Sequence, residues 1–156
     1  MGDFNTTNPP KQSVHKILAH SYVAYLLFFL IGVCLDFIFD FGIFNNFFIT
    51  QTGVVSLIFG TFLIMWAQYT SRNLNKENIT KDTFRHGPYR FTRMPTNFGL
   101  FFLTLGFGII VNAFFVVLSS FISLIVAKLV FIAKQEKVLA DKYGEPYLEY
   151  EKSVKF

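Results

Sequence analysis

The sequence predicts an all-α fold, a polytopic membrane bundle of about four transmembrane helices with a cytoplasmic helical tail at the C-terminus. Of the 156 residues, 53% are hydrophobic and only 15% are charged, whereas soluble domains carry about 25% charged residues. Several apolar runs are long enough to cross roughly 30 Å of hydrocarbon as helices. Lysine and arginine gather between and beyond these runs. These observations predict a single membrane domain over residues 1–156.

Four apolar runs define the expected spans in chain order. The first covers residues 17–35 and the second covers residues 53–69. After a polar segment, the apolar pattern resumes over residues 97–111 and again over residues 113–133. Asn112 separates the last two runs, and so short a connection makes two helices antiparallel neighbours. We therefore expect the third and fourth spans to form a hairpin.

Positive charge predicts the orientation of these spans, because lysine and arginine accumulate in short cytoplasmic loops. One basic group precedes the first span, one lies between the second and third, and one follows the fourth. Their members are Lys11, Lys16, Arg72, Lys76, Lys81, Arg85, Arg90, Arg93, Lys134, Lys137, Lys142, Lys152 and Lys155. Four spans place all three groups on one side. We therefore expect an integral membrane protein with cytoplasmic termini, in which the net charge of +4 needs no nucleic-acid partner.

Cysteine and histidine usage gives no reason to expect a metal site. Cys34 is the single cysteine and lies in an apolar run, so a disulfide framework or a cysteine metal cluster is not expected. His15 and His20 flank the first span and lack a partner at ligand spacing. We expect the protein to bind no metal.

A polar segment, residues 85–99, interrupts the apolar pattern before the third span. Its sequence, RHGPYRFTRMPTNFG, contains three arginines, one histidine, two prolines and two glycines. Pro95 is typical of the first turn of a helix, and a helix N-terminus favours an anionic ligand. Arg93 places a planar guanidinium beside that expected terminus. The polar segment is therefore a candidate binding site for an anionic group.

A second polar stretch, residues 133–156, follows the last span. Ala133–Tyr143 can continue the fourth helix beyond the membrane, and Gly144 can end it as a C-terminal cap. Gln135 and Glu136 lie about one turn past the last apolar residues. The hairpin of the third and fourth spans should bring this pair to face the polar segment at the same membrane depth.

Taken together, HGPYRFTRMPTNFG, a later QE and LADKYGEPYLEY resemble the motifs of the isoprenylcysteine carboxyl methyltransferase and phospholipid methyltransferase superfamily of integral membrane enzymes. That pattern is HGPYR-x-x-RHP-x-Y-x-G, an apolar stretch, then EE-x-x-L-x-x-x-FG-x-x-Y-x-x-Y. The similarity covers Thr83 to Phe156, with motif segments at 83–99 and 133–156. It implies a membrane methyltransferase-like domain that uses S-adenosylmethionine. The implied acceptor is lipophilic and comes from the bilayer, either an isoprenylcysteine-type carboxylate or a phospholipid amine, with the active site on the cytoplasmic face.

The resemblance also implies which residues form the site. Arg93 and Glu136 are the expected catalytic residues and are also expected to bind the cofactor. Arg93 would bind the α-carboxylate of the cofactor, and Glu136 would bind the cofactor's ammonium or ribose hydroxyls. The other cofactor-binding candidates match motif positions and are His86, Gly87, Pro88, Tyr89, Pro95, Asn97, Gly99 and Gln135. Methyl transfer depends on in-line positioning more than on a protein nucleophile. Only an amine acceptor needs a base, and His86 is the nearby side chain of the type that most often serves as one.

Three positions depart from the family pattern. Where the family has His, Tyr and Glu, this chain has Met94, Asn97 and Gln135. An alternative therefore stays open, a catalytically impaired family member that serves as a lipid-binding or partner-binding membrane scaffold.

Some of the candidate residues also have a purely structural interpretation. Gly99 suits close helix packing, and Tyr147 and Tyr150 suit anchoring of the tail at the membrane interface. Lys128 lies inside the last apolar run, and its long side chain can extend to the membrane surface.

Overall fold

The computed structural model describes residues 14–42, 47–72 and 85–154, and within these ranges it contains helices and no strands. In chain order the elements are α1 (Val14–Phe39), α2 (Phe47–Arg72), the 3-10 helix η1 (Gly87–Arg90), α4 (Pro95–Ile110), α5 (Phe114–Val126), the π-helical segment η2 (Ala127–Ile132), α6 (Ala133–Tyr143) and α7 (Glu145–Ser153). The predicted all-α class is confirmed.

The apolar helices have the length and composition of membrane spans. Three stretches are long and apolar enough to cross a bilayer, namely Ala19–Phe39, Phe47–Arg72 and Phe114–Asp141, and Pro95–Ile110 is a shorter apolar helix. Many of their large apolar side chains are exposed, and Phe62 on α2 is 58% exposed. Such an apolar surface suits contact with lipid. The backbone is suited to lipid as well, because the backbone groups of a spanning helix are hydrogen-bonded within the helix. The chain is therefore an integral membrane helical bundle.

The first two helices extend further toward each other than the apolar runs indicated. Against expected spans of 17–35 and 53–69, α1 continues to Phe39 and α2 begins at Phe47. The added turns are rich in phenylalanine and isoleucine, which can continue a helix surrounded by lipid. Helix α1 ends at Phe39, and the next residue, Asp40, has a backbone φ of 46°.

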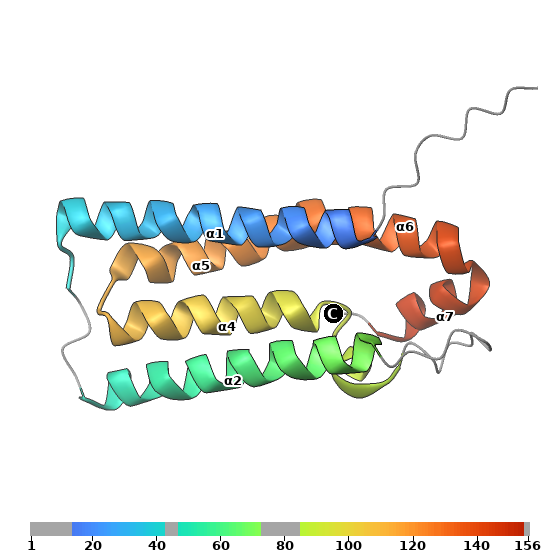
Figure 1. Cartoon of the computed structure of the whole chain (residues 1–156), viewed down its shortest axis with the longest axis horizontal. Coiled ribbons are helices and arrows are strands. Elements are labelled where there is room, and N and C mark those ends of the chain that lie inside the picture. The colour runs from blue at the N-terminus through green and yellow to red at the C-terminus, as the bar shows by residue number, and fades with distance from the viewer. Residues whose placement is uncertain (1–13, 43–46, 73–84, 155–156) are drawn as a thin grey trace, which may run out of the picture.

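The four long helices lie side by side in the order α1, α5, α4 and α2 (Figure 1). Glycines allow the close contact between α2 and α4. A Cβ atom at Gly60 would lie 2.6 Å from the carbonyl oxygen of Gly99, and one at Gly106 would lie 2.6 Å from the carbonyl oxygen of Gly53. Small residues facing each other in this way are typical of packed membrane helices, whose backbones approach closely. The structural interpretation of Gly99 is therefore confirmed.

A side chain of α1 fixes the start of α5. The carboxylate of Asp36 accepts hydrogen bonds from the backbone N–H groups of Phe115 (2.9 Å) and Val116 (2.8 Å). These N–H groups belong to the first turn of a helix and have no intrahelical partner. The connection from α4 is the expected tight turn, in which Asn112 has a φ of 59° and the N–H of Ala113 donates to the carbonyl of Gly108.

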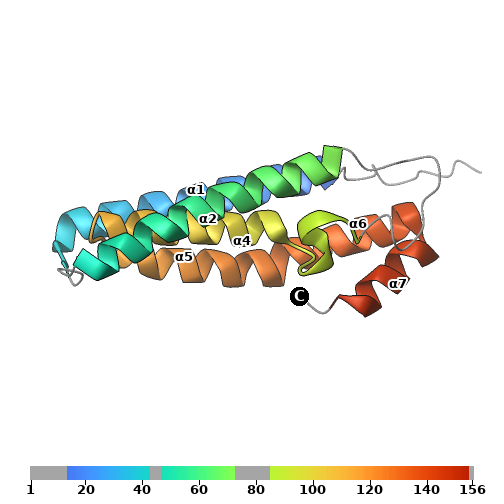
Figure 2. The ribbon, with the colours of Figure 1, turned by 90° about the horizontal axis from the view of Figure 1, so that it is seen from below.

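Beyond the bundle the chain forms two further helices, the second of which folds back along the first. Helix α5 continues through η2 into α6, and α6 ends at Gly144, where φ is 65°. Helix α7 then runs back beside α6 (Figure 2). Its buried residues Tyr147 and Tyr150, together with Val154 just after the helix, form a small apolar core with side chains of α6. The expectation that the two tyrosines anchor the tail at the membrane interface is wrong, because each is only 3% exposed.

Candidate functional site

The polar segment meets the α6–α7 hairpin at one end of the bundle (Figures 1 and 2). Helix α4 begins there at Pro95, and α6 follows directly from the bundle helix that packs on α4. The antiparallel turn at Asn112 produces this arrangement, because it returns the chain to the end at which α4 began. Two stretches that are distant in sequence are thereby brought into contact.

The backbone of the polar segment is folded by Gly87 and Pro88. Gly87 has a φ of 58°, and a Cβ atom added to it would collide with the side chain of Thr70 on α2. Pro88 is buried, and its carbonyl accepts hydrogen bonds from the N–H groups of Phe91 (3.1 Å) and Thr92 (3.2 Å). The close approach permitted by Gly87 is thus to α2. A contact between Gly87 or Pro88 and a cofactor stays a prediction.

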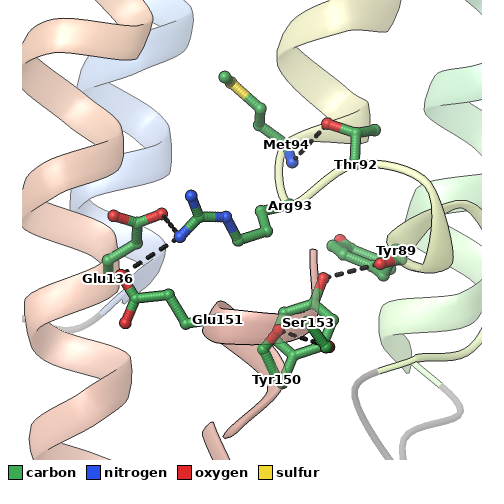
Figure 3. A network of polar contacts seen from close by, with 8 residues as sticks. All are labelled: Tyr89, Thr92, Arg93, Met94, Glu136, Tyr150, Glu151 and Ser153. Atoms are coloured by element: carbon green, nitrogen blue, oxygen red, sulfur yellow. Dashed lines mark hydrogen bonds and ion pairs between the residues drawn. The ribbon is translucent and has the colours of Figure 1, made fainter. Parts of the chain in front are cut away.

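Arg93 is the central charged residue of the site. Its Nη1 atom lies 2.5 Å from Oε1 of Glu136 on α6 and 3.3 Å from Oε1 of Glu151 on α7. Figure 3 shows the guanidinium directed at the two carboxylates, which approach it from different helices. The structure therefore brings together Arg93 and Glu136, which the sequence placed at the same membrane depth.

The charged side chains are largely withdrawn from solvent. Those of Arg93 and Glu136 are 20% and 21% exposed, and that of Glu151 is 35% exposed. Within the described ranges, Nε of Arg93 and Nε2 of Gln135 are buried and have no hydrogen-bond acceptor. A buried donor without a partner costs about 1 to 3 kcal/mol. Two such donors beside an ion pair form a place where a ligand's oxygen atoms would be stabilised.

Tyr89 connects the polar segment to three helices. Its hydroxyl forms hydrogen bonds with the side chains of Ser71 and Thr96, on α2 and α4, and burial raises its pKa. Its backbone carbonyl accepts a hydrogen bond of 2.8 Å from the hydroxyl of Tyr150 on α7. Burial also raises the pKa of Tyr150 far above its ordinary value, so this phenol stays a donor. Tyr89 thus holds the segment in place, and a stacking role toward a nucleoside stays a prediction.

Two candidates at the start of α4 make contacts within the bundle. Asn97 is 2% exposed. Its Oδ1 accepts a hydrogen bond from the hydroxyl of Ser21 (3.1 Å), and its carbonyl accepts one from the hydroxyl of Tyr25 (3.2 Å). Both donors lie on α1, whereas Gly99 faces α2. The contacts of Asn97 and Gly99 are thus with neighbouring helices, and a direct contact of either residue with a cofactor stays a prediction.

The remaining residues of the segment differ in burial. Pro95 and Met94 are buried at the start of α4, and the Met94 side chain does not cap that helix. His86 is exposed, as are Arg85 and Arg90. A role of His86 as a general base stays a prediction. Its exposed position at this end of the bundle is compatible with that role.

Glu151 is a site residue that the sequence reasoning missed. It lies on the same face of α7 as Tyr147 and Val154, since positions separated by three or four residues are neighbours on a helix. That spacing was visible in the sequence. The direction in which the face points was not, because it depends on how α7 folds back at Gly144.

Comparison with known proteins identifies a family to which the chain is similar. The family model described as phospholipid methyltransferase matches residues 48–146, which is more than half of the chain. The matched range contains nearly all of α2, together with the polar segment, α4 and α6, and therefore includes Arg93, Gln135 and Glu136. A comparison with curated proteins found no match, and a comparison with solved structures found none either.

Proposed function

Since the chain belongs to the phospholipid methyltransferase family, we propose that it transfers a methyl group from S-adenosylmethionine to a lipophilic acceptor at the cytoplasmic membrane face. The observation that carries this proposal is the Arg93–Glu136 pair beside two buried donors without partners. The family description favours a phospholipid amine as the acceptor, with an isoprenylcysteine-type carboxylate as the second class.

The donor set fits the amino acid end of S-adenosylmethionine. That end carries a carboxylate and an ammonium, and the molecule supplies an activated methyl group on its sulfonium when it is bound. The Nε atom of Arg93 and the Nε2 atom of Gln135 are donors suited to a carboxylate. Glu136 is an acceptor suited to an ammonium. Gln135 can therefore serve the site even though the family has Glu at its position, because here a donor is required.

The start of α4 supports the same assignment. Arg93 and Met94 immediately precede Pro95, the first residue of the helix. The N-terminus of a helix carries partial positive charge, which stabilises an anion nearby. A carboxylate held at Arg93 would therefore be stabilised by a full charge and by this terminus.

The charges at the two ends of the bundle support the proposed sidedness. The described arginines of the polar segment and the lysines of α6 lie at one end, whereas Asp36 and Asp40 lie at the other. The excess of positive charge in short loops marks the cytoplasmic side. A polar cofactor would then reach the site from the cytosol, and a lipophilic acceptor would reach it from the bilayer.

The purified protein in detergent, titrated calorimetrically with S-adenosylmethionine and S-adenosylhomocysteine, tests the cofactor assignment. We expect saturable binding of both. Incubation with methyl-labelled S-adenosylmethionine and either phosphatidylethanolamine vesicles or a farnesylated cysteine then identifies the acceptor class. A folded protein that binds neither compound would refute the proposed function.

A second candidate is a catalytically impaired family member that acts as a membrane scaffold. The observation that favours it is that the side chain of Asn97, at the position where the family has Tyr, accepts a hydrogen bond from Ser21 of α1. Binding of S-adenosylhomocysteine without methyl transfer to any lipid would support this candidate over the enzyme.

A further inference from the structure

We propose that Glu151 is an internal electrostatic competitor at Arg93, whose carboxylate at Nη1 opposes the binding of a ligand's carboxylate at the unpaired Nε of the same guanidinium. The inference rests on the proposed function and deepens it, because it assigns a regulatory side chain on α7 to the same site. Neither the family motif nor the resemblance gives Glu151 a role.

The geometry makes Glu151 the weaker of the two carboxylate partners. Both carboxylates approach Nη1 of Arg93, Glu136 at 2.5 Å and Glu151 at 3.3 Å. The Glu151 side chain is 35% exposed against 21% for Glu136. A partly exposed ion pair is weakened by solvent, and a carboxylate near the surface regains water when it leaves. Glu151 is therefore the partner that is exchanged at the lower cost.

The crowding of carboxylates around Arg93 favours an exchange. One guanidinium already serves two carboxylates, so these three groups carry a net negative charge. A third carboxylate at the same place would add repulsion in a site largely withdrawn from water, where charges interact more strongly than in bulk solvent. Departure of Glu151 removes one of the negative charges next to the ligand's carboxylate, while Glu136 stays available for the ammonium of the same ligand.

Helix α7 does not need Glu151 in order to stay docked. The Tyr150 hydroxyl donates to the carbonyl of Tyr89. Tyr147, Tyr150 and Val154 are buried against α6. Glu151 can therefore leave Arg93 through a side-chain movement, with the helix still docked. Tyr150 therefore attaches the helix, while the adjacent Glu151 competes with the ligand.

The test compares two ligands in calorimetric titrations of the full-length wild-type and Glu151→Gln proteins. S-Adenosylhomocysteine carries the carboxylate, and 5′-methylthioadenosine keeps the nucleoside but lacks the amino acid end. We expect Glu151→Gln to tighten binding of S-adenosylhomocysteine by roughly two- to fivefold, the range for a partly exposed ion pair. Binding of 5′-methylthioadenosine should not change. Glu149→Gln is the matched control, because it removes the same charge from an exposed position on α7 and should leave both affinities unchanged.

Each other outcome identifies what has failed. Unchanged or weaker binding of S-adenosylhomocysteine by a folded Glu151→Gln protein would overturn the competitor role and leave the proposed function intact. Equal tightening for both ligands, or for the Glu149→Gln control, would also overturn it, because a general charge effect would then explain the result. If the wild-type protein binds neither S-adenosyl compound, the proposed function itself fails and the competitor role fails with it.

Discussion

The strongest test of the site is removal of its two central charges, singly and together. Arg93→Ala deletes the guanidinium, and Glu136→Gln keeps the size of the side chain but deletes its charge. Both side chains are about four-fifths buried, at 20% and 21% exposure. They therefore belong with charge-assisted hydrogen bonds, worth about 1.5 to 3 kcal/mol each, and not with exposed ion pairs, which are worth about 0.2 to 1 kcal/mol.

These free energies translate directly into affinities. Each single variant should weaken binding of S-adenosylhomocysteine by roughly 10- to 150-fold, since about 1.4 kcal/mol corresponds to a factor of ten. Because Arg93 and Glu136 are in direct contact, the double variant should lose less than the sum of the two single losses, by about 0.5 to 3 kcal/mol.

Isothermal titration calorimetry in detergent measures these losses. Arg85→Ala is the matched control, because Arg85 is an exposed arginine of the same polar segment, and its loss should cost under about 1 kcal/mol. Arg93→Ala leaves Glu136 and Glu151 without their shared cation, so its thermal midpoint must be measured alongside. Arg93→Lys keeps the charge but lacks the planar fork, and should give an intermediate affinity in a folded protein.

Equal and small losses for folded Arg85, Arg93 and Glu136 variants would refute a role of Arg93 and Glu136 in cofactor binding. Strict additivity in the double variant would have a narrower meaning. It would show that the two residues bind the ligand independently, although they contact each other in the ligand-free geometry.

Three further predictions concern the scaffold. Asp36→Asn should destabilise the bundle by about 1 to 3 kcal/mol, since the carboxylate accepts two N–H groups at the start of α5, and a detergent unfolding series should show no comparable effect for Asp40→Asn. Gly60→Ala should lower stability by about 1 to 3 kcal/mol through overpacking, because the new Cβ would lie 2.6 Å from backbone atoms of α4; an unchanged thermal midpoint would contradict this packing. In a cysteine-free background, an impermeant thiol reagent applied to intact cells should label a cysteine placed at Asn46 but not one at Asn75, and the reverse pattern would overturn the orientation.

Local sequence rules were sufficient for the broad architecture and for the central pair of the site. Apolar runs predicted the helices because a helix is the structure that satisfies its own backbone in lipid. The short connection at Asn112 predicted an antiparallel hairpin, and the hairpin placed Arg93 opposite Glu136. Each step used residues that are close in sequence, or a constraint imposed by the membrane.

The contacts that escaped prediction depend on the relative rotation of packed elements. Tyr147 and Tyr150 were expected at the membrane interface, a location that an amphipathic tyrosine often takes. They are instead buried between α6 and α7, because the backbone turn at Gly144 directs α7 back along α6. The same turn determines that Glu151 faces Arg93, and nothing in the local sequence fixes its direction.

The family motif also does not separate ligand contacts from contacts that build the scaffold. Gly87 lies against Thr70, Asn97 is bonded to Ser21, and Gly99 lies against α2. A motif is recognised by residue type and spacing, and both kinds of contact impose such requirements. The buried donors without partners therefore discriminate better than the motif, because a donor that the protein does not satisfy is one that a ligand can satisfy.

The attachment of α7 shows how ligand binding could be sensed without opening the site. Tyr150 and Glu151 are adjacent, yet the first donates to a backbone carbonyl of Tyr89 and the second pairs with the side chain of Arg93. Displacement at Arg93 breaks only the ion pair, because the hydrogen bond from Tyr150 involves no group proposed to bind the ligand's carboxylate. The ligand state of Arg93 would then change the charge exposed on the surface of α7, while the hydrogen bond from Tyr150 keeps the helix attached to the polar segment.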